Sequence, residues 1–293
     1  MIPMDLSGKI ALVTGVGDNE SFAWFIAKSL QAAGAKIILA SHPRMVGIVE
    51  SFLSRDQDAP SRELPFVGGQ LKVEKVLPMD ARFDTMKDVD AETMADKRFN
   101  KHGDFSIENA VNSAGKLFGG IDIVVHAMAF SREIKKKMVE TSRSAYFEAL
   151  GISAYSLTSL LHYAEPFMTG RPGGASAVGL TYLGGSRVVP HYGGGMSTAK
   201  AALQIDAAQL AHNLGGKNIR VNLISAGPYA SRAAKGIGDI QHMIDYAAQR
   251  SPLPRGIEAE EVANSTVFLC SSLASAITGH ILYVDCGYNT MGV

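Results

Sequence analysis

Short apolar runs alternate along the chain with longer stretches in which apolar positions recur at helical spacing. The short runs are rich in Val, Ile and Leu, which predicts strands buried on both faces of a parallel sheet. We expect seven strands, at residues 9–14, 36–40, 72–77, 121–126, 175–181, 219–224 and 281–284. Helices are expected between them, most clearly at residues 21–33, 106–118, 143–165 (ended by Pro166), 196–214 and 259–273. The alternation predicts an α/β fold, a single-domain Rossmann-type doubly wound sheet of seven parallel strands with helices on both faces.

Two stretches do not fit this simple alternation. Residues 55–105 are polar and contain one evident strand, so we interpret them as a surface insertion. Residues 229–250 follow the sixth strand with small side chains and then a weakly amphipathic segment. Because long excursions at the carboxyl end of a strand commonly form lids, we expect a substrate lid here. Repeats and linker-like tracts are absent from the sequence, which indicates one domain over residues 1–293.

Composition narrows the class of protein. The chain has 293 residues, 46% of them hydrophobic, and its 28 Lys and Arg residues balance 28 Asp and Glu residues. Such a chain can bury a substantial core, and its zero formal charge gives no reason to expect nucleic acid or a membrane surface as a partner. No apolar run is long enough to span a bilayer, and the first residues lack the pattern of a signal peptide. The two cysteines predict neither a disulfide framework nor a metal site.

A glycine-containing turn joins the first strand to the first helix. Gly15 opens this turn and Ser21 closes it. Such a turn lets the backbone approach a pyrophosphate, whose charge the helix N-terminus stabilises. The spacing departs from GxGxxG, because Ser21 stands where a further glycine is expected. An ordinary tight turn between a strand and a helix is therefore the alternative interpretation.

A tyrosine and a lysine flank a second glycine run. Tyr192 precedes three glycines, and Lys200 follows them near the start of a helix. A phenol has an ordinary pKa of about 10, so a nearby cation helps it to donate or hold a proton near neutral pH. We interpret Lys200 as that cation and as a ligand for the ribose hydroxyls of a nucleotide. A solvated surface pair is the alternative, and the position of the pair after the fifth strand of a dinucleotide-type sheet disfavours it.

The motifs occur in the order found in one known superfamily. They are the glycine turn, residues 126–129 (HAMA) after the fourth strand, the pair Tyr192 and Lys200, and residues 225–228 (SAGP) after the sixth strand. Over nearly the whole chain this arrangement resembles the short-chain dehydrogenase/reductase superfamily. Within it, the chain looks most like the enoyl-acyl carrier protein reductases, in the long form known from plastids, apicomplexans and chlamydiae.

Three details favour this subfamily over the ketoreductases and alcohol dehydrogenases. Those enzymes usually have three residues between the tyrosine and the lysine, whereas seven intervene here. They also carry a serine about thirteen positions before the tyrosine, where this chain has Gly179. Tyr182 instead resembles the second tyrosine of the enoyl reductases. A ketoreductase, another short-chain dehydrogenase and a non-catalytic dinucleotide-binding protein stay open as alternatives.

The resemblance implies NADH-dependent reduction of the 2,3 double bond of trans-2-enoyl-acyl carrier protein thioesters in type II fatty-acid elongation. Conjugate addition of hydride places negative charge on a carbonyl oxygen remote from the attacked carbon, so the hydrogen-bond donor must be set differently from that of a ketoreductase. Tyr192 is expected to bond the thioester carbonyl and stabilise the enolate. Lys200 is expected to hold the coenzyme ribose while the nicotinamide delivers hydride to the β-carbon. Tyr182 is expected beside the substrate, with a merely buried aromatic as the alternative.

The resemblance also implies which residues contact the coenzyme and the acyl group. The coenzyme-binding residues that it implies are Gly15, Ser21, Phe22, His42, Asp80, Ala81, Ala127, Met128, Ala129, Lys200, Ala226, Gly227, Pro228 and Ser231. The substrate-binding residues that it implies are Tyr182, Tyr192, Met196, Ala230, Ala233 and Ile237.

The choice of coenzyme depends on the end of the second strand, which leads into Ser41, His42, Pro43 and Arg44. An acid in this region favours NAD, whereas an arginine suits the 2′-phosphate of NADP. We expect NADH from the family, and Arg44 leaves NADPH open. The family further implies acyl carrier protein as partner and a homotetramer built through the long helices. It implies a bacterial cytoplasm or, after loss of a transit peptide, the plastid stroma as location.

Overall fold

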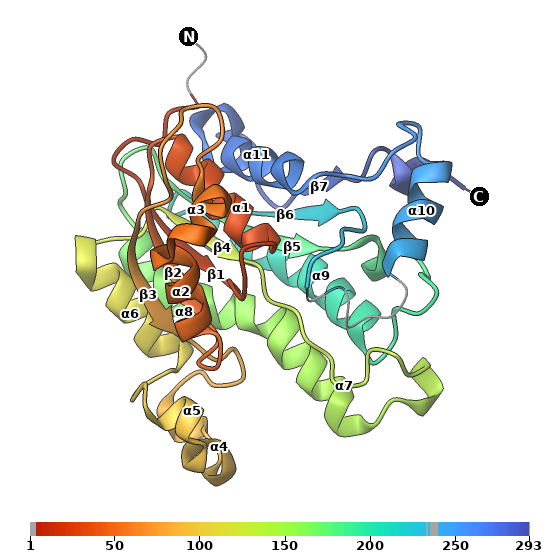
Figure 1. The fold of residues 1–293 in the computed structure, drawn as a ribbon, viewed down its shortest axis with the longest axis horizontal. Coiled ribbons are helices and arrows are strands. Elements are labelled where there is room, and N and C mark those ends of the chain that lie inside the picture. The colour runs from red at the N-terminus through yellow and green to blue at the C-terminus, as the bar shows by residue number, and fades with distance from the viewer. Residues whose placement is uncertain (1–3, 233, 235–239, 293) are drawn as a thin grey trace.

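The computed structural model describes residues 4–232, 234 and 240–292. Seven parallel strands form one sheet in the order β3-β2-β1-β4-β5-β6-β7 (Figure 1). Their bounds are β1 Ile10–Thr14, β2 Lys36–Ser41, β3 Val73–Pro78, β4 Ile123–His126, β5 Ala175–Thr181, β6 Ile219–Ala226 and β7 Ile281–Val284. The predicted fold class and the seven predicted strands are confirmed, with ends that shift by one or two residues.

Helices cover both faces of this sheet (Figure 1). They are α1 Phe22–Ala32, α2 Val46–Ser54, α3 Ala59–Arg62, α4 Ala91–Ala95, α5 Lys97–Asn100, α6 Ile107–Phe118, α7 Arg143–Leu150, α8 Ser156–Met168, α9 Met196–Gly215, α10 Ile240–Arg250 and α11 Ala259–Cys270. Side chains of β1 alternate between two cores. Leu12 packs in the core of α6, α8 and α9, and Val13 packs in the core of α1 and α11. A strand that serves two cores must be apolar throughout, which is why β1 is a continuous apolar run.

The long helix predicted at 143–165 differs from expectation in two ways. A π-helical turn, Gly151–Tyr155, separates α7 from α8. The prediction that Pro166 ends this helix is wrong, because α8 continues through it to Met168. Pro166 lies in the last turn, where few backbone hydrogen bonds depend on it. Phe167 and Met168 pack against the core, and that burial holds the final turn in place.

The polar stretch 55–105 supplies the edge strand β3 and three short helices. Residues 84–103, which we call the arm, carry α4 and α5 and project from the end of the sheet (Figure 1). A small aromatic cluster of Phe83, Phe99 and Phe105 anchors the arm to the body of the protein. The arm therefore has a packed base near the ends of β2 and β3.

The strand order reverses direction between β1 and β4, because β2 and β3 lie on one side of β1 while β4 to β7 lie on the other. In doubly wound sheets ligands bind outside the carboxyl ends of the strands at such a reversal. All seven strands are parallel, so their carboxyl ends share one edge. Among the described residues, no helix has both the length and the apolar character needed to cross a membrane.

Candidate active site

Gly15 fixes the closest approach between β1 and the segment that follows β4. Its φ is +79°, and a Cβ at this position would overlap the carbonyl oxygen of Ala127. Its backbone N–H donates to the carbonyl of Ala40 at 3.1 Å. Only glycine combines this left-handed conformation with so little space. The predicted turn residue therefore lies at the strand reversal, beside the predicted strip 127–129.

Ser21 closes the same turn as the N-cap of α1. Its hydroxyl accepts from the Trp24 backbone N–H at 3.4 Å and donates to the carbonyl of Asp18 at 3.0 Å. This role explains why the sequence departs from GxGxxG: a capping serine opens the helix where the usual pattern has a glycine. The N-terminus of α1, with its free backbone N–H groups and positive end of the dipole, faces the site as a pyrophosphate would require.

Two tyrosines meet at the end of β5. The rings of Tyr182 and Tyr192 make an edge contact with centroids 4.9 Å apart and planes at 66°. Lys200, in the first turns of α9, is 5% exposed, and its Nζ donates to the carbonyl of Leu180 at 2.7 Å. The three predicted catalytic residues are thus gathered around one strand end, although they come from separate parts of the sequence.

Burial is the largest influence on the pKa values of Tyr182, Tyr192 and Lys200. Burial raises the pKa of Tyr192, and the neighbouring Tyr182 raises it further. Burial also raises the pKa of Tyr182. Desolvation lowers the pKa of Lys200 itself to about 8, and the help that Lys200 gives to the Tyr192 phenol stays a prediction. Both phenols therefore stay protonated near neutral pH and serve as hydrogen-bond donors.

The glycine run between Tyr192 and Lys200 packs against the segment 131–136. The N–H of Gly193 donates to the carbonyl of Ile134 and that of Gly194 to the carbonyl of Lys136, both at 3.1 Å. A Cβ on Gly193 would overlap the oxygen of Lys136. The seven residues between tyrosine and lysine thus include a turn that another backbone crosses at close range, and this crossing explains the glycines.

The ends of β5 and β6 complete the site. Gly227 follows β6, and its N–H donates to the carbonyl of Val284 at 2.9 Å. The Tyr229 ring packs against Phe22 of α1 in a tilted contact, with ring centroids 4.9 Å apart and planes at 34°. This aromatic pair holds the segment after β6 in contact with the first turn of α1.

One cavity joins these elements, and most of the predicted site residues line it. The predicted residues in its walls are Gly15, Ser21, Phe22, Ala127, Met128, Ala129, Tyr182, Tyr192, Lys200, Ala226, Gly227, Pro228 and Ser231. Two predicted substrate residues lie elsewhere: Ala230 is exposed, and Met196 is buried with its Sδ 3.7 Å from the hydroxyl of Ser153. Ala233 and Ile237 lie outside the described residues.

Some lining residues are absent from the predicted set. They are Ala23, Leu180, Thr181, Tyr229, Ala234, Ile240 and Met243. Ile240 and Met243 belong to α10, whose weak amphipathic pattern indicated a helix but gave no sign of which face meets the cavity. Leu180 and Thr181 are the last residues of β5. Their position at the carboxyl end of this strand is the one sequence signal that would have placed them in the wall of the cavity.

Three predicted coenzyme residues, His42, Asp80 and Ala81, follow the ends of β2 and β3 and do not line this cavity. Asp80 is 2% exposed; Arg82 binds its carboxylate with two nitrogens, and His42 lies 3.4 Å from it. Burial alone would raise the pKa of Asp80, but hydrogen bonds from His42 and Arg82 outweigh it and lower the pKa to about 2. The carboxylate is therefore ionised and fixed at the end of the sheet where the adenosine half of a dinucleotide lies.

Comparisons with known proteins give a consistent result. A family model described as Enoyl-(Acyl carrier protein) reductase matches residues 87–289. A chloroplastic enoyl-[acyl-carrier-protein] reductase [NADH] of Arabidopsis thaliana is 46% identical over all of this chain and 74% of its own length. An enoyl-[acyl-carrier-protein] reductase [NADH] of Nostoc is 38% identical over 99% of this chain and all of its own length.

Solved structures are similar over the same extent. The Plasmodium berghei enoyl-acyl-carrier-protein reductase with triclosan has a TM-score of 0.92 and 39% identity, covering 97% of this chain and 99% of its own. The Anaplasma phagocytophilum reductase in complex with NAD has a TM-score of 0.78 and 35% identity, covering 98% of this chain and 96% of its own.

Proposed function

The chain belongs to the enoyl-[acyl-carrier-protein] reductase family of the short-chain dehydrogenase/reductase superfamily, and from this membership we propose how its residues act. It is an NADH-dependent enoyl-[acyl-carrier-protein] reductase of fatty-acid synthesis, as predicted from the sequence. The observation that carries the assignment of residues is the contact between Tyr182 and Tyr192 at the end of a strand that has Gly179 where ketoreductases have serine. A Cβ at Gly179 would lie 2.6 Å from the Leu223 side chain, so a serine does not fit without displacing it.

The residues around the cavity fit a nicotinamide dinucleotide. The tight turn at Gly15 and the capped N-terminus of α1 suit a pyrophosphate. Lys200 uses one of its three donor hydrogens on Leu180, which orients the ammonium and leaves two for ribose hydroxyls. The remaining predicted coenzyme residues flank these groups along the strand ends. When bound, NADH supplies the hydride that the β-carbon of the enoyl group accepts.

Tyr192 acts in this proposal as the donor to the thioester carbonyl oxygen. Its raised pKa keeps the phenol protonated, and a buried neutral donor is worth most where negative charge develops. Tyr182 contacts the Tyr192 ring by an edge and holds its orientation. We therefore assign Tyr192 to the oxyanion, Lys200 to the coenzyme ribose and Tyr182 to a place beside the substrate.

Replacing the two tyrosines separately tests these roles. Tyr192→Phe removes the donor while keeping the ring, and we expect kcat to fall by about 100-fold to 1,000-fold, the usual loss for one oxyanion donor. The Kd for NADH, measured by fluorescence titration, should change little. Tyr182→Phe preserves the edge contact and should cost far less in kcat. Wild-type turnover in Tyr192→Phe would remove this residue from the mechanism.

We propose that residues 229–250 act as a substrate lid. In the described part of this range, Tyr229, Ser231, Ala234 and two residues of α10 line the same cavity as the tyrosines. A segment that contributes one wall of a ligand cavity from after a strand end is well placed to close over the bound acyl group. The acyl chain would then contact this wall, opposite the strip 127–129.

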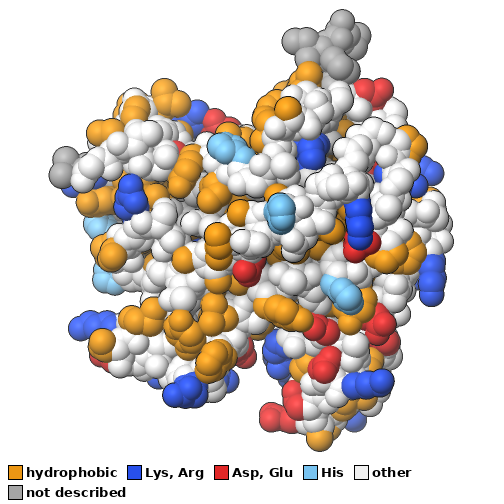
Figure 2. All heavy atoms as spheres, turned by 180° about the vertical axis from the view of Figure 1, so that it is seen from behind, with side chains coloured by type: hydrophobic (Ala, Val, Ile, Leu, Met, Phe, Trp, Pro, Cys, Tyr) orange, Lys and Arg blue, Asp and Glu red, His pale blue; other side chains and the backbone are white. Residues whose placement is uncertain are grey.

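We propose a homotetramer assembled through the long helices. Phe147 and Tyr155, on and beside α7, and Ile205 on α9 are each more than half exposed, and exposed apolar side chains that lie together mark protein–protein contacts. Figure 2 shows hydrophobic side chains gathered on the lobe that carries α7, at the lower left of that view. Light scattering after size exclusion measures the stoichiometry, and Phe147→Glu should reduce it. A monomeric wild-type protein would contradict this proposal.

The acyl group is carried to the site by acyl carrier protein, which the enzyme's substrate implies. We propose that the protein acts in a bacterial cytoplasm or a plastid stroma, in line with relatives that are cyanobacterial or named as chloroplastic.

A further inference from the structure

The turn after β2 contains an arginine, Arg44, whose charge is already paired with a carboxylate. In doubly wound sheets the residues after this strand meet the adenosine ribose, and an arginine there accommodates a 2′-phosphate. Arg44 is the arginine at this position, two residues after His42, whose ring lies 3.4 Å from the fixed carboxylate of Asp80. By residue type alone, Arg44 would favour NADPH, although the curated relatives of this chain are named for NADH.

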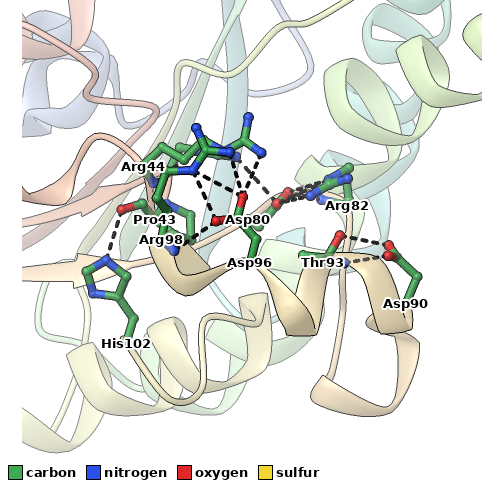
Figure 3. Close-up of polar contacts among 10 residues, drawn as sticks. Pro43, Arg44, Asp80, Arg82, Asp90, Thr93, Asp96, Arg98 and His102 are labelled. Atoms are coloured by element: carbon green, nitrogen blue, oxygen red, sulfur yellow. Dashed lines mark hydrogen bonds and ion pairs between the residues drawn. The ribbon is translucent and has the colours of Figure 1, made fainter. Parts of the chain in front are cut away.

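The arm holds this arginine. Nη2 of Arg44 lies 3.0 Å from Oδ2 of Asp96, the residue that precedes α5 (Figure 3). The guanidinium carbon lies over the Phe99 ring, 5.0 Å from its centroid. Nε2 of His102 lies 2.9 Å from the carbonyl oxygen of Pro43, next to Arg44 in the chain. Three contacts from one short segment thus bind the arm to the end of β2.

Asp96 is itself built into the fold. It is the N-cap of α5 and accepts from the backbone N–H of Arg98 at 2.9 Å, while the Arg98 side chain binds the same carboxylate with two nitrogens. These hydrogen bonds lower the pKa of Asp96 well below its usual range. The carboxylate therefore keeps its negative charge at every working pH, in a position fixed by a helix terminus.

We propose that Asp96 is a specificity-determining residue that favours NADH over NADPH by pairing with Arg44 at the end of β2. This inference rests on the proposed coenzyme site. The Asp96 carboxylate competes with a 2′-phosphate for the Arg44 guanidinium. Its negative charge also repels the 2′-phosphate, which carries between one and two negative charges near neutral pH. The 2′-hydroxyl of NADH brings no charge, so Asp96 discriminates between the two coenzymes without touching the nicotinamide.

The variant Asp96→Asn tests the proposal with little disturbance of the fold. Asparagine caps helices as well as aspartate does, so α5 keeps its N-cap while the charge is lost. The probes are adenosine 2′,5′-bisphosphate and adenosine 5′-monophosphate, titrated by calorimetry. We expect the ratio of their Kd values to shift toward the bisphosphate by about tenfold, the size expected for one unit charge near a phosphate in water. An unchanged ratio would overturn the proposal.

Two further variants identify the cause of the shift. Asp96→Asn combined with Arg44→Met restores the net charge of the wild-type cluster and should return the ratio close to its wild-type value. If the double variant keeps the shift toward the bisphosphate, Arg44 is not the group that Asp96 holds away from the 2′-phosphate. Asp88→Asn is the matched control, because it removes one charge from the same arm at a carboxylate that faces Thr85. If Asp96→Asn does not fold, Asp96→Ser supplies another good N-cap without the charge.

The titrations also separate this inference from the proposed function. Both probes lack the nicotinamide, so a shifted ratio supports the role of Asp96 even if the tyrosines are assigned wrongly. If neither probe binds the wild-type protein, the coenzyme site itself is misplaced and both proposals fail. If the probes bind as proposed, the ratio of kcat/KM for NADPH to kcat/KM for NADH should change from variant to variant in the same direction as the preference for the bisphosphate.

Discussion

The glycine run before α9 offers a sharp test of how the site is positioned. Gly193→Ala adds one methyl group where the backbone of segment 131–136 crosses. Because that methyl would overlap the carbonyl oxygen of Lys136 and lie 3.2 Å from that of Ile134, backbone must move on one side of the crossing. The two backbone hydrogen bonds that join Gly193 and Gly194 to this segment would be strained or lost.

The structure sets the expected size of the effect. A backbone hydrogen bond contributes about 1 kcal/mol, so loss of two predicts a decrease of about 2 kcal/mol in the free energy of unfolding. The adjacent Tyr192 would be displaced by about 1 Å, a shift that can cost about 100-fold in rate when it moves a reacting group. We therefore expect kcat to fall by about 100-fold in Gly193→Ala, with the Kd for NADH less affected.

Urea unfolding and steady-state turnover of an enoyl thioester measure the two effects separately. The matched control is Gly215→Ala on α9, where a Cβ meets nothing within 4 Å and helix propensity favours alanine. That control should keep wild-type turnover. If Gly193→Ala loses stability but keeps its kcat, the crossing does not position Tyr192. If it loses neither, the packing described for the glycine run is wrong.

Three other predictions follow from the site. Burial lowers the pKa of Lys200 to about 8 from 10.5, so between these pH values the unfolded chain holds a proton that the folded chain has released; stability should rise with pH by at most about 1.4 kcal/mol per unit. Urea unfolding at pH 7 and 9.5 should show a larger rise of the unfolding free energy with pH in the wild type than in Lys200→Met. An equal change with pH in the two proteins would refute this prediction. Limited proteolysis within 229–250 should slow when coenzyme and a thioester are bound, and identical cutting in both states would contradict a lid. Gly179→Ser should lower stability by about 1–3 kcal/mol through its clash with Leu223 without creating ketone reduction, and a gain of that activity would contradict the account.

The sheet was predictable because its strands are buried on both faces. β1 and β4 are apolar at nearly every position, and such runs between helical patterns have few alternatives. The turn at Gly15 and the pair Tyr192 and Lys200 were also recognisable, since each depends on residues close together in the sequence. Their convergence on one cavity follows from the parallel order of the strands.

Features that depend on tertiary packing were not predictable. Pro166 does not end its helix, because burial of the following residues outweighs a local preference. The direction of the Tyr192 pKa shift depends on burial by distant elements, which the spacing to Lys200 does not reveal. The pairing of Arg44 with Asp96 joins residues 52 positions apart, and the polar sequence of the arm gave no sign of it.

The most direct test of the central claim is absorbance loss at the nicotinamide band with a 2-enoyl thioester in one cuvette and a 3-ketoacyl thioester in the other. The wild-type protein should oxidise NADH only with the enoyl thioester, because its donor is set for a carbonyl oxygen remote from the attacked carbon. NADPH in parallel cuvettes should be the poorer coenzyme. Oxidation only with the 3-ketoacyl thioester would contradict the assignment of conjugate reduction, while leaving the fold and the dinucleotide site in place.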